Sequence, residues 1–249
     1  VSKDVYYIQC ADPVYFNNPV LIGEDKSLWQ FNAKMNQLEA YIHHNGRVIE
    51  EHLFLRASEK IVRTEIVADE NINYLVVFVR ENDQLSSVKI LFAEGKKLRV
   101  VNCSPISESE LKMQGSWSAN INGINVCSHI GGPVITWCDY NGPHSYHNLD
   151  VYVSQLRHSA WTKPIILGSV VADFYPNVTA YDDEILVAWG SSLESFHAAL
   201  INSEKGIKKE WQVVNMREAL GVSIFYRNIT PIKEEETIAV LFEFATADR

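Results

Sequence analysis

The sequence predicts an all-β fold made of repeated antiparallel meanders, and three observations carry this prediction. Short apolar or alternating runs of strand length follow one another closely along the chain. Polar turns rich in Gly, Asn, Asp and Ser separate these runs, as is typical of hairpins. Helix-like stretches are confined to residues 104–114 and 215–220. We therefore expect the 249 residues to form one all-β domain, residues 1–249.

The clearest structural unit runs from Asp173 to Trp211 and contains three strands followed by the start of a fourth. Residues 177–181 alternate between apolar and polar, residues 185–189 are continuously apolar, and residues 196–201 form the third strand. The acidic run Asp182-Asp183-Glu184 is expected to be a solvated hairpin tip. Because strands this close together are joined by hairpins, the unit is predicted to be an antiparallel meander.

Weaker copies of this unit recur along the chain, and one hydrophobic pivot residue marks each copy. The pivots are Ile42, Phe78, Trp137, Trp189 and Phe242, at intervals of 36, 59, 52 and 53 residues, and each is expected on the second strand of its unit. Residues 50–55 and 61–67 are expected to complete the unit that contains Ile42. Blade repeats of β-propellers run to about 40–50 residues. One small meander cannot bury both of its faces, whereas a ring of meanders can. We therefore predict a five- or six-bladed β-propeller in which an N-terminal strand at Asp4–Ala11 closes the ring.

The end of the clearest unit resembles a turn from a known family. Ser203-Glu204-Lys205-Gly206 leads to Trp211, which is similar to the Asp-box repeat of BNR-type, sialidase-like propellers, roughly Ser-x-Asp-x-Gly-x-x-Trp. Lys205 stands where the box has Asp, and one extra residue precedes Trp211. Ser154 and Trp161 keep the outer spacing of the box without its Gly. The resemblance implies a propeller fold, and because the box is a structural turn it implies no activity by itself.

Composition and charge exclude several classes of partner. A net charge of −9 argues against nucleic acid or an anionic membrane surface as the main partner. No apolar run approaches the roughly 20 residues that span a bilayer, so no membrane span is expected. The chain begins at Val1 rather than Met, so we expect a processed or trimmed terminus. The sequence indicates no particular compartment.

The four cysteines also indicate no metal or redox centre. They lack the CxxC spacing of a zinc site or a thioredoxin-like motif, and they are Cys10, Cys103, Cys127 and Cys138. Cys127 and Cys138 lie on neighbouring predicted strands, where we expect buried thiols, with a disulfide as the alternative. No cofactor is predicted.

The longest polar loop within a predicted blade, residues 139–148, is the leading candidate for ligand contact. Loops carry function and aromatic residues favour contacts, and this loop holds Asp139, Tyr140, His144, Tyr146 and His147. His144, His147 and Asp139 are residue types that ligate zinc or iron. An exposed loop whose Gly and Pro set its bends is the simpler interpretation, so no metal is predicted.

The predicted fold adds further candidates by position. In a propeller, the loop after the second strand of each blade lies on the same face as the start of the first strand. This face adds the candidate ligand-binding residues His43, His44, Arg80, Tyr175 and Arg227. A surface of His, Arg and Tyr side chains suits a protein or a glycan ligand, so we predict a non-catalytic binding or interaction module. A solvated rim that holds no ligand is the simpler alternative.

The alternative from another class is a sialidase-like or other glycoside hydrolase that uses the same face. The resemblance would then imply three arginines, a Tyr–Glu pair and an Asp acid. Only Arg80 and Arg227 fall on the predicted face, so no catalytic residue is assigned.

Overall fold

The computed structural model describes residues 20–22, 28–34, 37–44, 47–68, 73–81, 84–94, 97–103, 124–141, 149–157, 160–168, 173–191, 195–202, 204–215, 224–234 and 237–246. Every regular element in these segments is a β-strand, which confirms the all-β prediction. The helix-like stretch 104–114, residues 216–220 of the second such stretch, and the expected closing strand Asp4–Ala11 lie outside the described residues.

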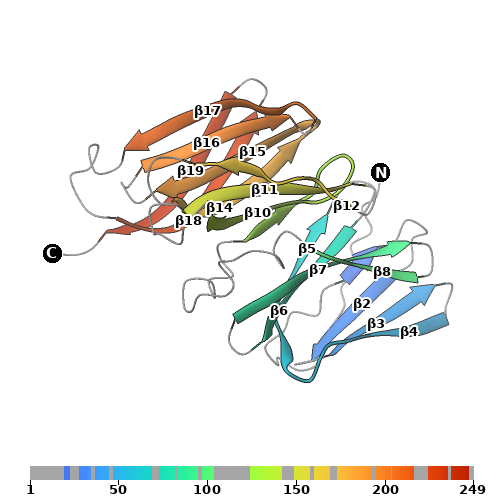
Figure 1. The fold of residues 1–249 in the computed structure, drawn as a ribbon. Helices are drawn as coiled ribbons and strands as arrows, with labels where there is room; N and C mark the ends of the chain where they lie inside the picture. The colour runs from blue at the N-terminus through green and yellow to red at the C-terminus, as the bar shows by residue number, and fades with distance from the viewer. Residues whose placement is uncertain are drawn as a thin grey trace.

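The strands form five antiparallel sheets that follow one another in chain order (Figure 1). The first sheet contains β1 (Val20–Ile22), β2 (Leu28–Lys34), β3 (Gln37–His44) and β4 (Arg47–Phe54). The second contains β5 (Glu59–Ala68), β6 (Asn73–Glu81), β7 (Gln84–Glu94) and β8 (Lys97–Asn102). The fourth contains β14 (Asp173–Tyr181), β15 (Glu184–Ser191), β16 (Ser195–Asn202) and β17 (Gly206–Asn215). The fifth pairs β18 (Ile224–Glu234) with β19 (Thr237–Thr246).

The third sheet is the same kind of meander with an interrupted outer strand. It contains β9 (Asn125–Cys127), β10 (Val134–Tyr140) and β11 (Leu149–Arg157), and two short strands, β12 (Ala160–Trp161) and β13 (Ile165–Leu167), both pair with β11. Pro164 lies between β12 and β13 and has no N–H to donate to a ladder. The Thr162 main-chain N–H donates instead to the Gln155 carbonyl oxygen at 2.9 Å.

Successive sheets pack face to face because their strands are apolar on both faces. On β6, Leu75, Val77 and Val79 pack against Leu38 and Ala40 of the first sheet. The alternate β6 side chains face the third sheet and are Tyr74, Val76 and Phe78. Likewise Val134 of β10 packs with the fourth sheet, whereas Ile135 and Trp137 pack with the second. An alternation with a period of two, apolar in both phases, is expected of strands buried on both faces.

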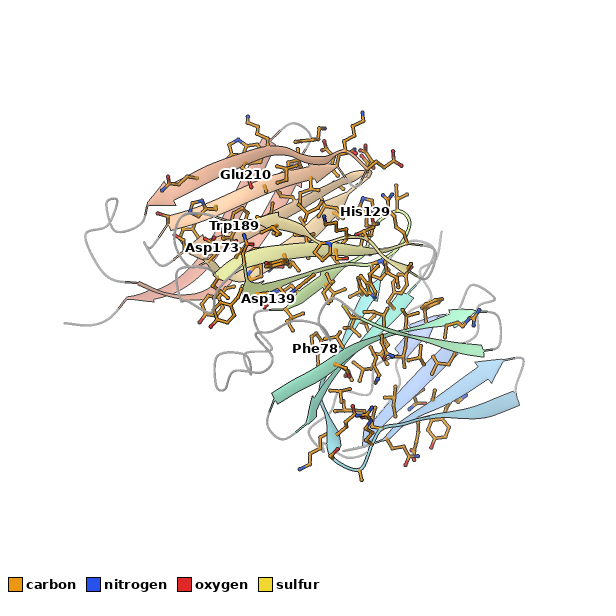
Figure 2. The ribbon with its side chains drawn as sticks, viewed as in Figure 1. Phe78, His129, Asp139, Asp173, Trp189 and Glu210 are labelled. Carbon is orange, nitrogen blue, oxygen red and sulfur yellow. The ribbon has the colours of Figure 1, made fainter. Side chains whose placement is uncertain are left out.

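The five pivot residues lie one in each sheet, as the sequence predicted. Figure 2 shows Phe78 in the second sheet and Trp189 in the fourth. Two assignments within this pattern are wrong. Ile42 lies on the third strand of its sheet rather than the second, because the short β1 precedes β2. Residues 61–67 were expected to complete the first sheet, but they pair with β6 and so begin the second.

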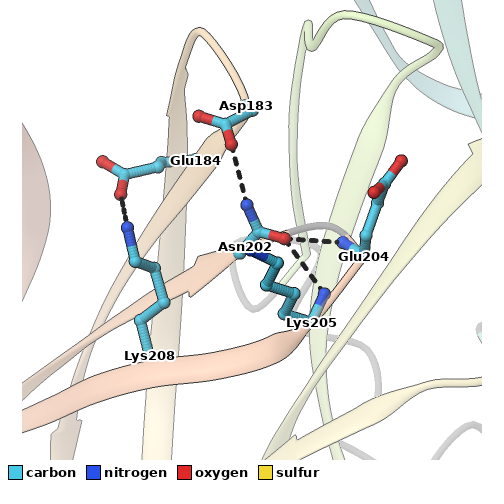
Figure 3. Close-up of polar contacts among 6 residues, drawn as sticks. All are labelled: Asp183, Glu184, Asn202, Glu204, Lys205 and Lys208. Carbon is cyan, nitrogen blue, oxygen red and sulfur yellow. Dashed lines mark hydrogen bonds and ion pairs between the residues drawn. The ribbon is translucent and has the colours of Figure 1, made fainter.

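Hydrogen bonds and an ion pair join the two hairpins at one end of the fourth sheet (Figure 3). The Asn202 amide donates to Asp183 Oδ2 at 2.8 Å, and Asn202 Oδ1 accepts from the main-chain N–H groups of Glu204 and Lys205 at 3.1 and 3.0 Å. Lys208 forms an ion pair with Glu184. Tyr181 pairs with Glu184 around the exposed Asp182 and Asp183, which confirms the predicted hairpin tip for these two residues. Glu184 was expected to be solvated with them, but it begins β15 and is buried. The fourth strand begins at Gly206, earlier than the predicted Trp211.

Candidate functional site

The candidate site lies at the end of the fourth sheet opposite this hairpin tip, and a β-bulge in β14 shapes it. Phe174 pairs with Gly190 and Asn177 pairs with Ala188, so Tyr175 and Pro176 together face the single residue Trp189. Tyr175 has a φ of 51°, in the left-handed region that non-glycine residues rarely adopt. Bulges are common beside functional sites because they redirect a side chain.

The same bulge position recurs in other sheets. β5 has an irregularity between Ile61 and Arg63, and β18 has one between Tyr226 and Asn228. Both lie in the first half of the first strand of their sheets, as does the bulge in β14. Sequence reasoning missed this repeated feature, although Pro176 within a strand pattern signals a bulge.

Cys138 of β10 connects the third sheet to this bulge. Its thiol is buried between the two sheets, and the main-chain N–H of Tyr175 donates a hydrogen bond to its sulfur. Burial, and then the negative charge of Asp173, raise the pKa of the Cys138 thiol, with smaller contributions from Asp139 and Asp150. A second hydrogen bond joins the third sheet to the bulge, in which the Asn125 side-chain amide of β9 donates to the Pro176 carbonyl oxygen at 2.6 Å. The end of β10, the start of β11 and the start of β14 therefore lie together.

We call this group the rim cluster and define it as Cys138, Asp139, Tyr140, Asp150, Asp173 and Tyr175. Tyr140 and Tyr175 are half-buried, as is Asp139. Asp173 has no exposed surface, and Asp150 is 7% exposed. Figure 2 shows Asp139 and Asp173 on neighbouring sheets. The rim cluster thus combines partly exposed aromatic rings with carboxylates.

Two of the carboxylates face each other across β10 and β11. Asp139 pairs with Asp150 in the register of these strands. Asp139 Oδ1 accepts from the Tyr140 main-chain N–H at 2.8 Å, and Asp150 Oδ2 accepts from the Asn141 amide at 2.8 Å. Burial raises the pKa of Asp150, and the hydrogen bond from Asn141 partly offsets this effect. Gly168 leaves room for this carboxyl group, since a Cβ there would lie 2.4 Å from Asp150 Oδ1.

The structure brings together three of the residues that the sequence singled out, namely Asp139, Tyr140 and Tyr175. His144, Tyr146 and His147 lie outside the described residues. His43 is exposed near the end of β3 and His44 ends that strand, while Arg80 lies near the end of β6 and Arg227 lies at the bulge of β18. The side chains of His44, Arg80 and Arg227 are not among those described.

Sequence reasoning placed the segments that contain Asp173 and Ser191 on the predicted face, but it did not assign Cys138, Asp150 or Trp189 to the site. Cross-strand register determines their positions, and register cannot be read from spacing alone. Trp189 stacks on His197 across β15 and β16 with ring centroids 5.6 Å apart. Burial lowers the pKa of His197, so its imidazole favours the neutral form.

The cysteines of the third sheet are free thiols, as expected. Cys127 pairs with Val134, four residues before Cys138. Four residues along a strand span about 13 Å, too far for a disulfide. Burial raises the pKa of Cys127 to about 12. Among the described side chains, no group of three or more His, Cys, Asp or Glu is arranged to hold a metal ion.

No helix in the described segments has the length and apolar character needed to cross a membrane.

No family model matches the chain, and no curated protein matches it. Among solved structures, the chain is similar to an ACO/RPE65 chimera, with a TM-score of 0.43, 7% identity, and coverage of 88% of this chain and 52% of that one. It is also similar to a tryptophan-to-alanine mutant of Synechocystis apocarotenoid oxygenase, with a TM-score of 0.43, 8% identity, and coverage of 88% and 52%. A further ACO/RPE65 chimera in a trigonal crystal form gives a TM-score of 0.44, 7% identity, and coverage of 92% and 53%. The chain spans about half the length of these proteins, and likeness at this level carries no argument about activity.

Proposed function

We propose that the protein is a non-catalytic binding module that holds a protein or glycan ligand at the rim cluster. The observation that supports this proposal is the hydrogen bond from the Tyr175 main-chain N–H to the sulfur of Cys138, two residues before Tyr140, which joins the bulge of the fourth sheet to the third sheet. Half-buried aromatic rings supply large contact areas at low cost in conformational entropy. The left-handed backbone of Tyr175 supports a functional role, because such a conformation is retained where the surroundings impose it.

We propose further that the five sheets are blades of a five- or six-bladed β-propeller, closed by the N-terminal strand. Chain-order meanders, burial of β6 and β10 on both faces, and one pivot per sheet support this arrangement. The rim cluster would then lie on the face that carries the loops after the second strands. We propose that the turn at Glu204–Gly206 is a degenerate Asp-box, in which Asn202 stabilises the turn in place of the missing Asp.

The binding proposal is tested with a glycan array and a displayed peptide library, screened with the whole chain. We expect at least one ligand to be retained by the wild type and lost by the double variant Tyr140→Ala, Tyr175→Gly. Glycine is chosen at 175 because it accepts a φ of 51° without strain. Tyr181→Ala, at the opposite end of β14, is the matched control and should bind normally. Equal binding by the double variant and the wild type would exclude the rim cluster as the ligand site.

A glycoside hydrolase is the second candidate, and the Asp139–Asp150 pair is the observation that favours it. Glycosidases use two carboxyl groups, and the acid of the pair has a raised pKa, as Asp150 does. The hydrogen bonds that both carboxylates already accept favour a structural role instead. The discriminating experiment is hydrolysis of a panel of fluorogenic glycosides between pH 4 and 8. Turnover that Asp150→Asn abolishes would favour the enzyme over the binding module.

A further inference from the structure

The turn between β9 and β10, residues 128–133, is tied to β11 by one buried side chain, Gln155. The side-chain nitrogen of Gln155 lies 2.8 Å from His129 Nδ1 and donates to the Gly132 carbonyl oxygen at 3.2 Å. Gln155 is 3% exposed and His129 is 5% exposed. Within the turn, the Gly132 main-chain N–H donates to the His129 carbonyl oxygen at 2.9 Å. A single amide therefore connects the imidazole of His129 to the backbone of the turn.

Two contacts determine which way the Gln155 amide points. Arg157 Nε donates to Gln155 Oε1 at 2.7 Å, and a guanidinium group can only donate. The Gly132 carbonyl oxygen can only accept, so it must face the amide nitrogen. The amide nitrogen then also donates to His129 Nδ1, which must be the ring nitrogen without a proton. These hydrogen-bond roles assign His129 as a neutral imidazole that carries its proton on Nε2.

Protonation of His129 conflicts with this arrangement. An imidazolium ring carries a proton on both nitrogens and has no acceptor, so Nδ1 would face the Gln155 nitrogen donor to donor. Turning the amide over would give the imidazolium an acceptor. It would also set the amide oxygen against the Gly132 carbonyl oxygen and the amide nitrogen against Arg157. A proton on Nδ1 therefore costs buried hydrogen bonds while the turn is closed, whereas an opened turn accepts the proton without this cost.

The charged groups around the turn offer little compensation for an imidazolium. Arg157 lies across the Gln155 amide and would repel it, and Cys127 stays neutral because burial raises the pKa of its thiol to about 12. Figure 2 shows His129 at the end of the third sheet away from Asp139. The fourth sheet carries its hairpin tips at that end, with the charged residues Asp182, Asp183, Glu184, Glu204, Lys205 and Lys208. Glu184 is paired with Lys208 and the other carboxylates are exposed, so solvent and salt screen them.

We propose that His129, Gln155 and Arg157 form a pH-sensitive latch, which holds the 128–133 turn closed while His129 is neutral and releases it when His129 takes up a proton. Histidine side chains ordinarily change charge between pH 5 and 8, so mild acidification supplies the signal. The latch goes beyond the proposed binding function, because it lies at the opposite end of the third sheet from the rim cluster. It controls the display of Ile130, which is 68% exposed in the turn between the buried residues His129 and Gly132.

The test measures amide hydrogen exchange in the whole ¹⁵N-labelled chain at pH 7.5 and 5.0, with rates corrected for their intrinsic pH dependence. The reporters are the main-chain N–H of Gly132, bonded to the His129 carbonyl oxygen, and that of Leu156, bonded to the Pro133 carbonyl oxygen. We expect the protection of both reporters to fall at pH 5.0 by about ten-fold more than that of the amides of β15, as for an equilibrium linked to one proton. The His129 Cε1–H signal should titrate over the same pH range as this loss.

His129→Asn is the matched control, because its side-chain oxygen can accept from Gln155 as Nδ1 does and it takes up no proton in this range. In this variant the excess loss of protection should disappear. His197 is present in both proteins, so any effect of its own titration cancels. Equal excess loss in His129→Asn and the wild type would overturn the latch. If that variant does not fold, the wild type alone decides: titration of His129 with both reporters still protected, or loss of protection while His129 stays neutral, would also overturn it.

Discussion

Asp173, the first residue of β14, pairs with Ser191, the last residue of β15, and neither side chain is more than 2% exposed. A carboxylate and a hydroxyl are thus buried side by side where two strands end. Strand ends of this kind normally place polar groups in water, and burying them carries a cost unless partners are present. The buried Ser191 hydroxyl, which has no hydrogen-bond partner among the described residues, is therefore a place where stability is given up locally, as is typical of functional sites.

The hydroxyls of Ser191 and Thr136 are buried without a hydrogen-bond partner among the described residues. Their effect on the free energy of unfolding can be measured by removing them. Ser191→Ala and Thr136→Val should leave the free energy of unfolding unchanged or raise it by up to about 1 kcal/mol, because each removes a buried group that makes no hydrogen bond. Ser154 is the matched control, since it is equally buried but its hydroxyl donates to the Thr162 carbonyl oxygen at 2.8 Å. Ser154→Ala should cost about 1–2 kcal/mol. Urea denaturation provides the measurement, and a comparable loss in Ser191→Ala would show that its hydroxyl is bonded.

The left-handed backbone of Tyr175 gives a second prediction. Tyr175→Val should be less stable than Tyr175→Gly by about 1–2 kcal/mol, because a β-branched residue is strained at a φ of 51° and glycine is not. The same two substitutions at Thr179, later on β14, should give the reverse order, since glycine weakens an ordinary strand. Thermal or urea unfolding of the four variants measures the order of stability of the valine and glycine variants at each position. A valine variant more stable than the glycine variant at both positions would mean that residue 175 has an ordinary strand conformation.

Local features of this fold could be predicted from the sequence, whereas features set by register could not. The pivots fall one to a sheet because a short apolar run flanked by turn residues is a local signal. Residues 61–67 were assigned to the wrong sheet because pairing with β4 or with β6 would satisfy the same pattern. The approach of Tyr175 to Cys138 depends on how two sheets stack. Spacing therefore found Tyr140 and Tyr175 separately, and only the structure shows that the Tyr175 main chain contacts Cys138, two residues before Tyr140.

Adjacent glycines in the turn before β10 give a third prediction, because they differ in their surroundings. A Cβ at Gly132 would lie 1.9 Å from the Leu156 carbonyl oxygen, whereas a Cβ at Gly131 would have its nearest neighbour, Gln155 Nε2, at 4.0 Å. Both residues have positive φ, 129° and 110°. Gly131→Ala should therefore cost about 1–2 kcal/mol from backbone strain alone. Gly132→Ala should cost more than about 3 kcal/mol or prevent folding, because it also displaces the backbone of β11. Equal stability of the two variants would contradict this turn geometry.

Asp150 predicts a pH effect on stability. Burial raises its pKa in the folded protein above the value of 3.8, so the folded state binds more protons than the unfolded state just above that pH. Its contribution to stability therefore falls as pH rises through this window. Asp150→Asn removes this effect, so its stability relative to the wild type should be higher at pH 7 than at pH 3. Urea denaturation of Asp150→Asn and the wild type at both pH values measures this difference in relative stability and its sign. A relative stability that is the same at both would show that Asp150 titrates normally.

His197 predicts an effect of the opposite sign, at higher pH. Burial lowers the pKa of its imidazole below 6.5 in the folded protein, so the unfolded state binds the proton first as pH falls. The free energy of unfolding should therefore decrease between pH 7.5 and pH 5.5, through the unfolded pKa toward the folded one. His197→Phe keeps an aromatic ring against Trp189, whose centroid lies 5.6 Å from that of His197, and it removes the titrating group. Urea denaturation followed by tryptophan fluorescence should show a smaller decrease in this variant than in the wild type. Since the other titrating groups are common to both proteins, an identical decrease would mean that protonation of His197 is not opposed by its burial.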